Sequence, residues 1–181
     1  MPDPDAVQIT EVGKRASVRV KAWSPAGISA PGSAAEPLAA ERSAASIVPP
    51  GLEEQVRVLS FAPAEWLVVS DGIEGPRLAD QLSQRVAGEG MAVVDLSCAL
   101  KALRVEGPAA RELLSRGCGL DLHPRTFPAG LASRTRFAQL PVIIHCTDPK
   151  PSFDLYVGRS YLHYLRSWLI DAAVEFQKKR C

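Results

Sequence analysis

Two segments near the middle of the chain have the alternating pattern of short β-strands. In 55–63, with the sequence QVRVLSFAP, the alternating positions Val56, Val58 and Ser60 indicate a strand with one buried face. In 65–70, with the sequence EWLVVS, apolar side chains fall on both faces. A strand that is apolar on both faces is typical of the middle of a sheet, so we expect 65–70 to be central.

Further strands are expected on either side of this region. Residues 91–97 begin with a short apolar run, and apolar and polar positions alternate in 98–107, where Leu103 is followed by Val105. Near the N-terminus, Val7–Ile9 and Ser17–Ala22 can each supply a short strand.

Two segments have the pattern of amphipathic helices bounded by proline or glycine. In 77–90, the apolar residues of one face recur every four positions and are followed by glycines that can end the helix: Leu78, Leu82, Val86, Gly88 and Gly90. In 107–119, Pro108 is expected at the first helical position, where its missing N–H costs nothing. Gly117 and Gly119 are expected to end that helix in the left-handed conformation.

The C-terminal third predicts three strands in succession. Residues 132–140 and 141–147 are separated by little, which indicates a hairpin. In 153–157, with the sequence FDLYV, apolar side chains alternate with Asp154 and Tyr156.

Residues 159–180 predict a long amphipathic helix with Ser160 as its N-cap. The expected buried face has heptad-like spacing: Leu162, Leu165, Leu169, Ala172 and Phe176. A second stripe of Tyr161, Tyr164 and Trp168 runs beside it. This aromatic stripe either widens the contact with the chain's own sheet or meets another protein, because Tyr and Trp often anchor interfaces.

The order of expected elements from residue 56 is β-β-α-β-β-α-β-β-β-α. Three strands in a row favour antiparallel pairing over a doubly wound parallel sheet. We therefore expect an α+β fold of two small mixed α/β subdomains with largely antiparallel sheets.

The first 50 residues differ in composition from the rest. Residues 24–50 are rich in Ala, Ser, Pro and Gly and have few large apolar groups, so they cannot form a core alone. We expect residues 1–50 to hold an N-terminal strand and an extended arm, and residues 51–181 to form the α+β domain. The arm either crosses the surface of the chain's own fold or wraps a partner subunit.

Length and charge exclude few classes of function. The chain has 181 residues, enough to bury a core without disulfides or metals. Its 21 basic and 20 acidic residues give a net charge of +1, which provides no general attraction to nucleic acid or anionic membranes. No apolar run approaches the ~20 residues that span a bilayer, and no secretory signal is visible. A cytoplasmic protein with reduced thiols is expected.

The cysteines and histidines do not have the spacing of zinc ligands. They are widely spread and include no C-x-x-C pair: Cys98, Cys118, Cys146, Cys181, His123, His145 and His163. Cys98 is expected to be a small buried residue, because no histidine near it in sequence would activate it. Structural roles are expected for His145 and His163. The sequence also has no G-x-G-x-x-G, P-loop or G-x-S-x-G motif.

The segment 120–130, LDLHPRTFPAG, places Asp121, His123 and Arg125 within five residues, a combination suited to a catalytic loop. A catalytic loop would need a second group of reactive residues, and the sequence offers none. As a connector, the segment is fully explained. Asp121 can bind nearby backbone, the two prolines fix the path of the chain, and Gly130 frees it into the next strand. The pattern favours a connector over a catalytic site.

Several of these segments together resemble the gamma subunit of heterotetrameric sarcosine oxidase. The motifs occur in order between Glu65 and Phe176: D-L-S after a strand, G-P-x-A before a helix, L-D-L-H-P, and F-D-L-x-V-x-R-S before the last helix. The resemblance covers roughly two thirds of the chain.

The resemblance implies part of the glycine-cleavage T-protein fold and membership of a complex of four unlike subunits. Such a complex oxidatively demethylates sarcosine to glycine, producing hydrogen peroxide and either formaldehyde or methylenetetrahydrofolate. It implies FAD, FMN and NAD on the alpha and beta subunits, tetrahydrofolate in the alpha subunit and zinc on the delta subunit.

For this chain, the resemblance implies no catalytic, cofactor-binding or metal-binding residues. It implies a role in assembly, with the alpha, beta and delta subunits as partners and neither nucleic acid nor membrane. The alternatives are a gamma-type subunit of a related N-methyl amino acid dehydrogenase and a stand-alone folate-binding protein of the T-protein fold.

One position departs from the T-protein pattern. In that fold, the strand before the corresponding helix often has a glycine, an aromatic residue and a glutamate that reaches folate. Ser152, Phe153 and Asp154 stand at these places. The glycine is missing and the carboxylate is one methylene shorter, so we do not expect Asp154 to bind folate.

Overall fold

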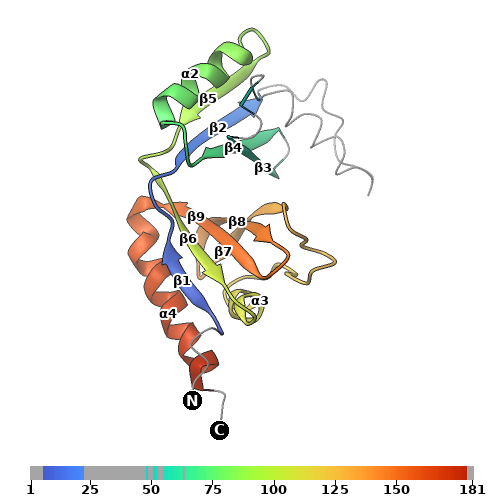
Figure 1. The fold of residues 1–181 in the computed structure, drawn as a ribbon, viewed down its shortest axis with the longest axis vertical. Coiled ribbons are helices and arrows are strands. Elements are labelled where there is room, and N and C mark those ends of the chain that lie inside the picture. The colour runs from blue at the N-terminus through green and yellow to red at the C-terminus, as the bar shows by residue number, and fades with distance from the viewer. Residues whose placement is uncertain (1–5, 23–47, 49–50, 53–54, 63, 179–181) are drawn as a thin grey trace. The chain divides into compact units, whose positions relative to one another are not determined.

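The computed structural model describes residues 6–22, 48, 51–52, 55–62 and 64–178. Two compact units, each with its own sheet, make up the chain (Figure 1). Contacts group residues 1–13 with residues 99–181, and residues 14–98 form the second unit. The chain therefore begins in one unit, builds the other, and returns to the first.

The first unit contains a five-stranded sheet in the order β1-β6-β9-β8-β7, in which all neighbours are antiparallel. Its strands are β1 (Gln8–Glu11), β6 (Leu100–Glu106), β7 (Ala132–Phe137), β8 (Leu140–Asp148) and β9 (Ser152–Gly158). Its helices are α3 (Ala110–Ser115) and α4 (Leu162–Lys178), with a 3-10 turn, η1 (Arg159–Tyr161), before α4. Figure 1 shows α4 running alongside β1 and β6.

The core of this unit lies between one face of the sheet and the two helices. From the sheet it takes side chains that are paired across neighbouring strands, such as Leu103, Leu155 and Ile144. From α4 it takes Leu165 and Leu169, which are fully buried. Of the buried stripe expected on the last helix, Leu165, Leu169 and Phe176 are confirmed as buried. Leu162 and Ala172 are only partly buried, and the neighbouring Ala173 is buried instead of Ala172.

The central strand β9 is buried on both faces. Phe153, Leu155 and Val157 face the core, as expected. Asp154 and Tyr156 point to the other face, but their exposed fractions are only 0% and 2%. The expected alternation of the two sets of side chains across the strand is therefore confirmed, and the polar set is buried as well.

The expected hairpin is confirmed as β7 and β8, which pair from Phe137↔Leu140 to Ala132↔His145. Its turn consists of Ala138 and Gln139, with φ angles of 47° and 72°. Two successive positive φ angles are typical of the tight turns that suit the twist of a hairpin. Neither residue is the Asn or Gly that usually marks such a turn, so the sequence did not locate it.

The second unit contains a four-stranded sheet in the order β3-β4-β2-β5, also antiparallel. Its elements are β2 (Ala16–Ala22), β3 (Arg57–Ala62), β4 (Glu65–Ser70), α2 (Gly75–Arg85) and β5 (Met91–Asp95). All six residues of β4 are buried, which confirms its expected central place. Leu78 and Leu82 from α2, and Val86 at its C-cap, share a core with Val18, Val20 and Val68.

Helix α2 begins at Gly75, two residues earlier than expected, because Pro76 lies within its first turn. The helix ends before Gly88 and Gly90, whose φ angles are 81° and 66°. These two glycines have the left-handed conformation that the sequence indicated.

Three expectations about helix ends are wrong. Pro108 lies in a turn before α3, whose N-cap is Ala109. Ser160 lies inside η1, whose N-cap is Gly158 and makes no side-chain cap bond. Gly117 and Gly119 do not have positive φ angles.

The structure gives Gly117 a different reason. A Cβ atom at this position would lie 2.3 Å from Cζ of Phe137. The glycine is needed because the backbone passes against an aromatic ring, not because the helix ends there.

The expected α+β class with largely antiparallel sheets is confirmed. Residues 23–47, which hold most of the expected arm, lie outside the described residues. The division at residue 50 therefore stays a prediction. Within the described residues, the first 22 contribute a strand to each of the two sheets.

Candidate functional site

The segment 120–130 holds itself together through local hydrogen bonds. Oδ1 of Asp121 accepts the backbone N–H of His123 at 2.9 Å, and Oδ2 accepts the hydroxyl of Thr126 at 2.9 Å. The bond from the His123 backbone, followed by that from Thr126, lowers the pKa of Asp121. Asp121 therefore works as a turn-forming carboxylate, as the connector interpretation requires.

His123 and Arg125 are also engaged in the turn. Nδ1 of His123 accepts the backbone N–H of Arg125 at 3.2 Å, and the His123 carbonyl accepts the N–H groups of Thr126 and Phe127. Both His123 and Arg125 are exposed. At Gly130 the φ angle is 87°, which agrees with the conformational freedom expected of it.

Sequence reasoning missed Arg111, the residue that fastens this segment to the core. From α3, Nη1 of Arg111 donates to the carbonyls of Leu122 and Phe127, the latter at 3.2 Å. The guanidinium also lies 5.0 Å from the centre of the Phe153 ring, and Nη2 is 3.7 Å from Sγ of Cys146. No sequence signal distinguishes Arg111 from other charged residues on short helices.

The D-L-S motif has a structural explanation too. The backbone N–H and the hydroxyl of Ser97 both donate to Oδ1 of Asp95, at 2.9 and 2.5 Å. The Ser97 hydroxyl oxygen accepts the N–H of Ser17 at 3.0 Å. At the start of α2, a Cβ on Gly75 would lie 2.2 Å from this hydroxyl oxygen. The motif joins the end of β5 to β2 and to the first turn of α2.

The aromatic stripe on the last helix divides into two parts. Trp168 is half-buried and meets Phe137 edge to face, with 5.0 Å between ring centres. Tyr161 and Tyr164 are 46% and 50% exposed. Trp168 therefore belongs to the chain's own core, and the two tyrosines are available at the surface.

Asp154 forms a charged pair in the middle of the sheet. Its carboxylate accepts Nε of Arg104 at 2.8 Å and Nη2 at 3.0 Å, and its side chain has no exposed area. Arg104 lies directly opposite on β6, and His145 lies opposite on β8. Both oxygens of this carboxylate already bind a guanidinium, which supports the expectation that Asp154 does not bind folate.

The remaining candidate residues, three cysteines and two histidines, differ in how far they are buried. Cys98 is exposed in a turn after β5, so the expectation that it is buried is wrong. His145 is buried and His163 is exposed on α4. Burial raises the pKa of the Cys118 and Cys146 thiols. Among the residues that the structure describes, no three His, Cys, Asp or Glu side chains gather as a metal site would require.

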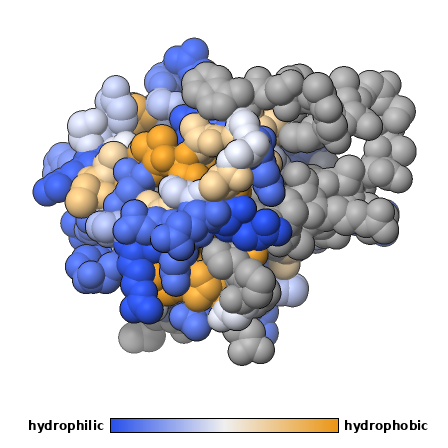
Figure 2. All heavy atoms as spheres, turned by 90° about the horizontal axis from the view of Figure 1, so that it is seen from above, coloured by the Kyte–Doolittle hydropathy of each residue, from blue (hydrophilic) through white to orange (hydrophobic). Residues whose placement is uncertain are grey.

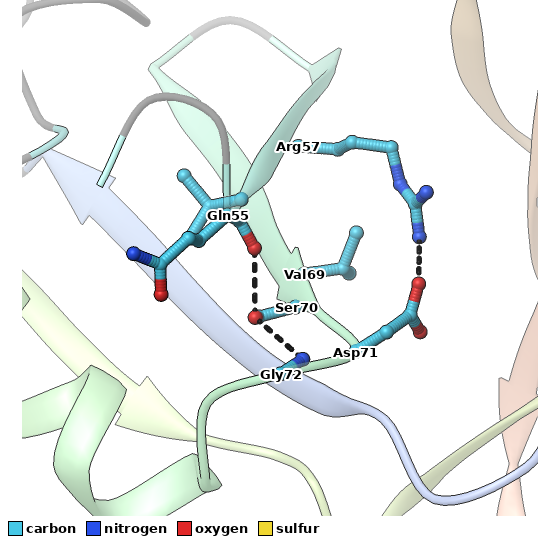
Figure 3. A pocket seen from close by; sticks show the side chains of 7 residues that line it. Gln55, Arg57, Val69, Ser70, Asp71 and Gly72 are labelled. Carbon is cyan, nitrogen blue, oxygen red and sulfur yellow. Dashed lines mark hydrogen bonds and ion pairs between the residues drawn. The ribbon is translucent and has the colours of Figure 1, made fainter. Parts of the chain in front are cut away.

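The four-stranded unit has a pocket beside a cluster of charged side chains (Figure 3). Asp71 accepts Nε of Arg15 at 2.6 Å and Nη2 of Arg57 at 2.8 Å. Burial alone would raise the pKa of Asp71, but the hydrogen bonds and charges of the two arginines outweigh it and leave the pKa lowered.

The polar groups at the rear of this pocket are used within the chain. The Ser70 hydroxyl donates to the Gln55 carbonyl at 2.8 Å and accepts the N–H of Gly72 at 3.2 Å. Figure 3 shows this chain of bonds crossing from Gln55 to Gly72. The Ser70 hydroxyl therefore already has partners within the chain.

Exposed apolar groups are concentrated on α4 and its leading turn. The large exposed apolar side chains of the described residues are Val94, Leu131, Tyr161, Tyr164, Ile170 and Val174. Viewed from above, apolar atoms form small areas separated by hydrophilic side chains (Figure 2). In the described part of the chain, no helix is both long and apolar enough to cross a membrane.

Comparisons with known proteins show to which family the chain belongs. Residues 35–175 match the model described as the sarcosine oxidase, gamma subunit family. The chain belongs to this family. Among curated proteins, it is similar to sarcosine oxidase subunit gamma of Corynebacterium sp. strain P-1, with 36% identity over 126 residues, and of strain U-96, with 37% over 119 residues. These matches cover 70% and 66% of this chain but only 61% and 57% of the relatives, so the chain matches about three fifths of their length.

Solved structures support the family membership. The chain is similar to a chain of the heterotetrameric sarcosine oxidase from Corynebacterium sp. U-96, with a TM-score of 0.76 and 29% identity. That match covers 99% of this chain and 89% of the other. The glycine cleavage system aminomethyltransferase T from Bartonella henselae shares the fold, with a TM-score of 0.59, 15% identity, and coverage of 91% and 45%. The T-protein-like fold expected from the sequence is therefore confirmed.

Proposed function

We propose that the chain is the gamma subunit of a heterotetrameric sarcosine oxidase and that its role is assembly. The observation that carries this proposal is the likeness to a chain of the heterotetrameric enzyme from Corynebacterium sp. U-96, which extends over 99% of this chain. The family match over residues 35–175 supports the same assignment.

In this proposal, the complex oxidatively demethylates sarcosine to glycine, producing hydrogen peroxide and either formaldehyde or methylenetetrahydrofolate. The alpha, beta and delta subunits are the partners, and they hold FAD, FMN, NAD, zinc and tetrahydrofolate. This chain supplies no catalytic residue, and the complex works in the cytoplasm.

The geometry of the described residues supports an assembly role. The Asp-His-Arg segment is used in a turn, and Asp154 is used in an ion pair, so neither is free to act on a substrate. Tyr161 and Tyr164 on the helix surface, and His123 and Arg125 on the connector, are the exposed side chains most suited to contact a partner.

Co-purification from the native host, with an affinity tag on this chain, tests the proposal. We expect three further subunits to elute with the tagged chain, an absorption spectrum typical of flavin, and release of peroxide when sarcosine is added. Reduction of an artificial electron acceptor without peroxide would indicate an N-methyl amino acid dehydrogenase instead. A tagged chain that elutes alone, free of flavin, would contradict a role in the complex.

A further inference from the structure

The five-stranded sheet has a second face, opposite the core with α3 and α4. This face carries the ion pair of Arg104 and Asp154. On β6, β9 and β8, the residues of this face around the pair follow from the strand register: Ala102, Arg104, Ile143, His145, Asp154 and Tyr156. The exposed fractions of Tyr156, His145 and Ile143 are 2%, 4% and 9%, so the surroundings of the pair are closed to solvent. Arg104 itself keeps a partly exposed side chain, at 33%. Arg134, which lies opposite Ile143 on β7, is exposed at the edge of this face.

The ion pair between Arg104 and Asp154 is bidentate. Two neighbouring N–H groups of Arg104, on Nε and Nη2, point at the two oxygens of Asp154 at 2.8 and 3.0 Å. Such bidentate pairs are the strongest hydrogen-bonded ion pairs in proteins, and their planar geometry makes them specific.

A folate would bring the same pattern of donors to a carboxylate. The pterin ring carries a 2-amino group beside a ring N–H, so two parallel N–H bonds point in one direction. A guanidinium edge and a pterin edge therefore compete for the same pair of carboxylate oxygens. In the T-protein pattern, a glutamate at this place reaches folate. In this chain, the carboxylate at that place is Asp154, and Arg104 already donates to it.

We propose that Arg104 is a built-in occupant of the carboxylate that a folate would need, and that this chain consequently does not bind folate. The inference rests on the T-protein-like fold of the proposed gamma subunit. It assigns Arg104 and Asp154 as positioning residues that join β6 to β9, and it leaves reduced folate to another subunit.

The energetics favour retention of Arg104 over exchange for a ligand. A ligand would have to displace the guanidinium from a carboxylate with no exposed area, and removing one partner of a buried pair is strongly destabilising.

Calorimetric titration of the full-length chain with 5-formyltetrahydrofolate, a stable reduced folate, tests the inference. We expect no saturable heat of binding up to about 1 mM ligand. A dissociation constant below about 1 mM would be detected in this range. Thermal unfolding should also be unchanged by the ligand. A protein of measured folate affinity, titrated in parallel, controls for the quality of the ligand. Saturable binding to this chain, whether or not Asp154→Asn abolishes it, would overturn the inference.

A double-mutant cycle tests the pair itself. Arg104→Met and Asp154→Asn should each lower the midpoint of denaturant unfolding, and the double variant should be less destabilised than the sum of the two. Additive losses would show that the two residues are not coupled and would overturn the assigned role.

The outcome is separable from the test of the proposed function. Co-purification of partner subunits does not depend on folate, so a chain that neither binds folate nor elutes with partners would contradict only the proposed function. A chain that joins the complex and binds folate by itself would contradict only the inference.

Discussion

At the scale of single residues, close packing explains features that the sequence indicated for other reasons. Gly117 was expected to end a helix by its conformational freedom, yet its φ angle is not positive and it is required by the Phe137 ring. Arg111 gave no signal in the sequence, yet it connects α3, the segment 120–130 and Phe153. A side chain's partner on a distant strand is decided by tertiary contacts, which local pattern cannot report.

The contact at Gly117 predicts a clear effect of one methyl group. Gly117→Ala should lower the free energy of unfolding by about 1–3 kcal/mol, the usual cost of overpacking. Gly119→Ala is the matched control, because nothing lies within 4 Å of its Cβ and its φ angle is not positive. Urea unfolding of both variants checks the prediction. Equal effects of the two substitutions would show that the Phe137 contact is not responsible.

The bonds of Arg111 to the segment 120–130 lead us to expect that the conformation of this segment depends on that one side chain. Arg111→Met keeps the apolar stem but removes the bonds to the carbonyls of Leu122 and Phe127. We expect a loss of about 2 kcal/mol, since hydrogen bonds from a charged group are worth more than neutral ones. Limited proteolysis should then cut the segment 120–130 faster. Arg125→Met, at an exposed position of the same segment, should change stability by less than about 0.5 kcal/mol. Unchanged proteolysis in Arg111→Met would contradict this role.

At the scale of elements, apolar periodicity predicted most strands and helices but not their ends. The central place of β4 followed from its two apolar faces, and the buried stripe of α4 followed from its spacing. The limits of α3, the turn at Ala138 and Gln139, and the start of α4 at η1 did not follow. Those ends are set by backbone geometry and by contacts across the sheet, for which the residues present are not the usual markers.

The same limitation applies to the candidate site. The sequence favoured a connector at 120–130, and the hydrogen bonds of Asp121 and His123 agree with it. The expectation that Asp154 does not bind folate stays a prediction until it is measured, but its physical reason is now specific. In the sequence, the shorter side chain of Asp154 and the missing glycine suggested a poor folate ligand. Its hydrogen-bonding partner, Arg104, lies 50 residues away in sequence, so local pattern could not reveal it.

The two parts of the aromatic stripe predict different phenotypes. Trp168→Ala should lower the free energy of unfolding by about 2 kcal/mol, less than for a fully buried aromatic residue, because it loses the contact with Phe137. Tyr164→Ala should leave stability within about 0.5 kcal/mol. If Tyr164 meets a partner, the variant should instead reduce co-purification of the other subunits. Normal co-purification with the double variant Tyr161→Ala/Tyr164→Ala would remove this surface from consideration.

At the scale of the whole molecule, the path of the chain is its main organising feature. β1 lies at the edge of the five-stranded sheet, and the next 85 residues, 14–98, form the other unit before the chain returns as β6. The pairing of Gln8 with Glu106 closes this excursion. Both ends of the chain therefore belong to one unit, and the four-stranded unit is an insertion between its first two strands.

This path predicts a local effect of truncation. A chain that begins at Lys14 loses β1, and with it the burial of Val7 and the packing of Ile9 on the core. We expect a loss of about 3 kcal/mol in the first unit, from the apolar area returned to water. Hydrogen exchange should rise along β6, which becomes an edge strand, while β2 and β4 stay protected. A uniform rise in both sheets would contradict this local effect.

The long return from β1 to β6 also sets an order of events during synthesis. A ribosome delivers β1 first, but its partner on β6 emerges more than 90 residues later, as the pair Gln8↔Glu106 shows. By then β2 to β5 have all left the exit tunnel, so the four-stranded unit can close while β1 still has no neighbour. Non-local pairings are slow because loop closure precedes any gain from contact. The first strand to be made is therefore expected to be among the last to pair, and the four-stranded insertion is expected to fold before the five-stranded unit is completed.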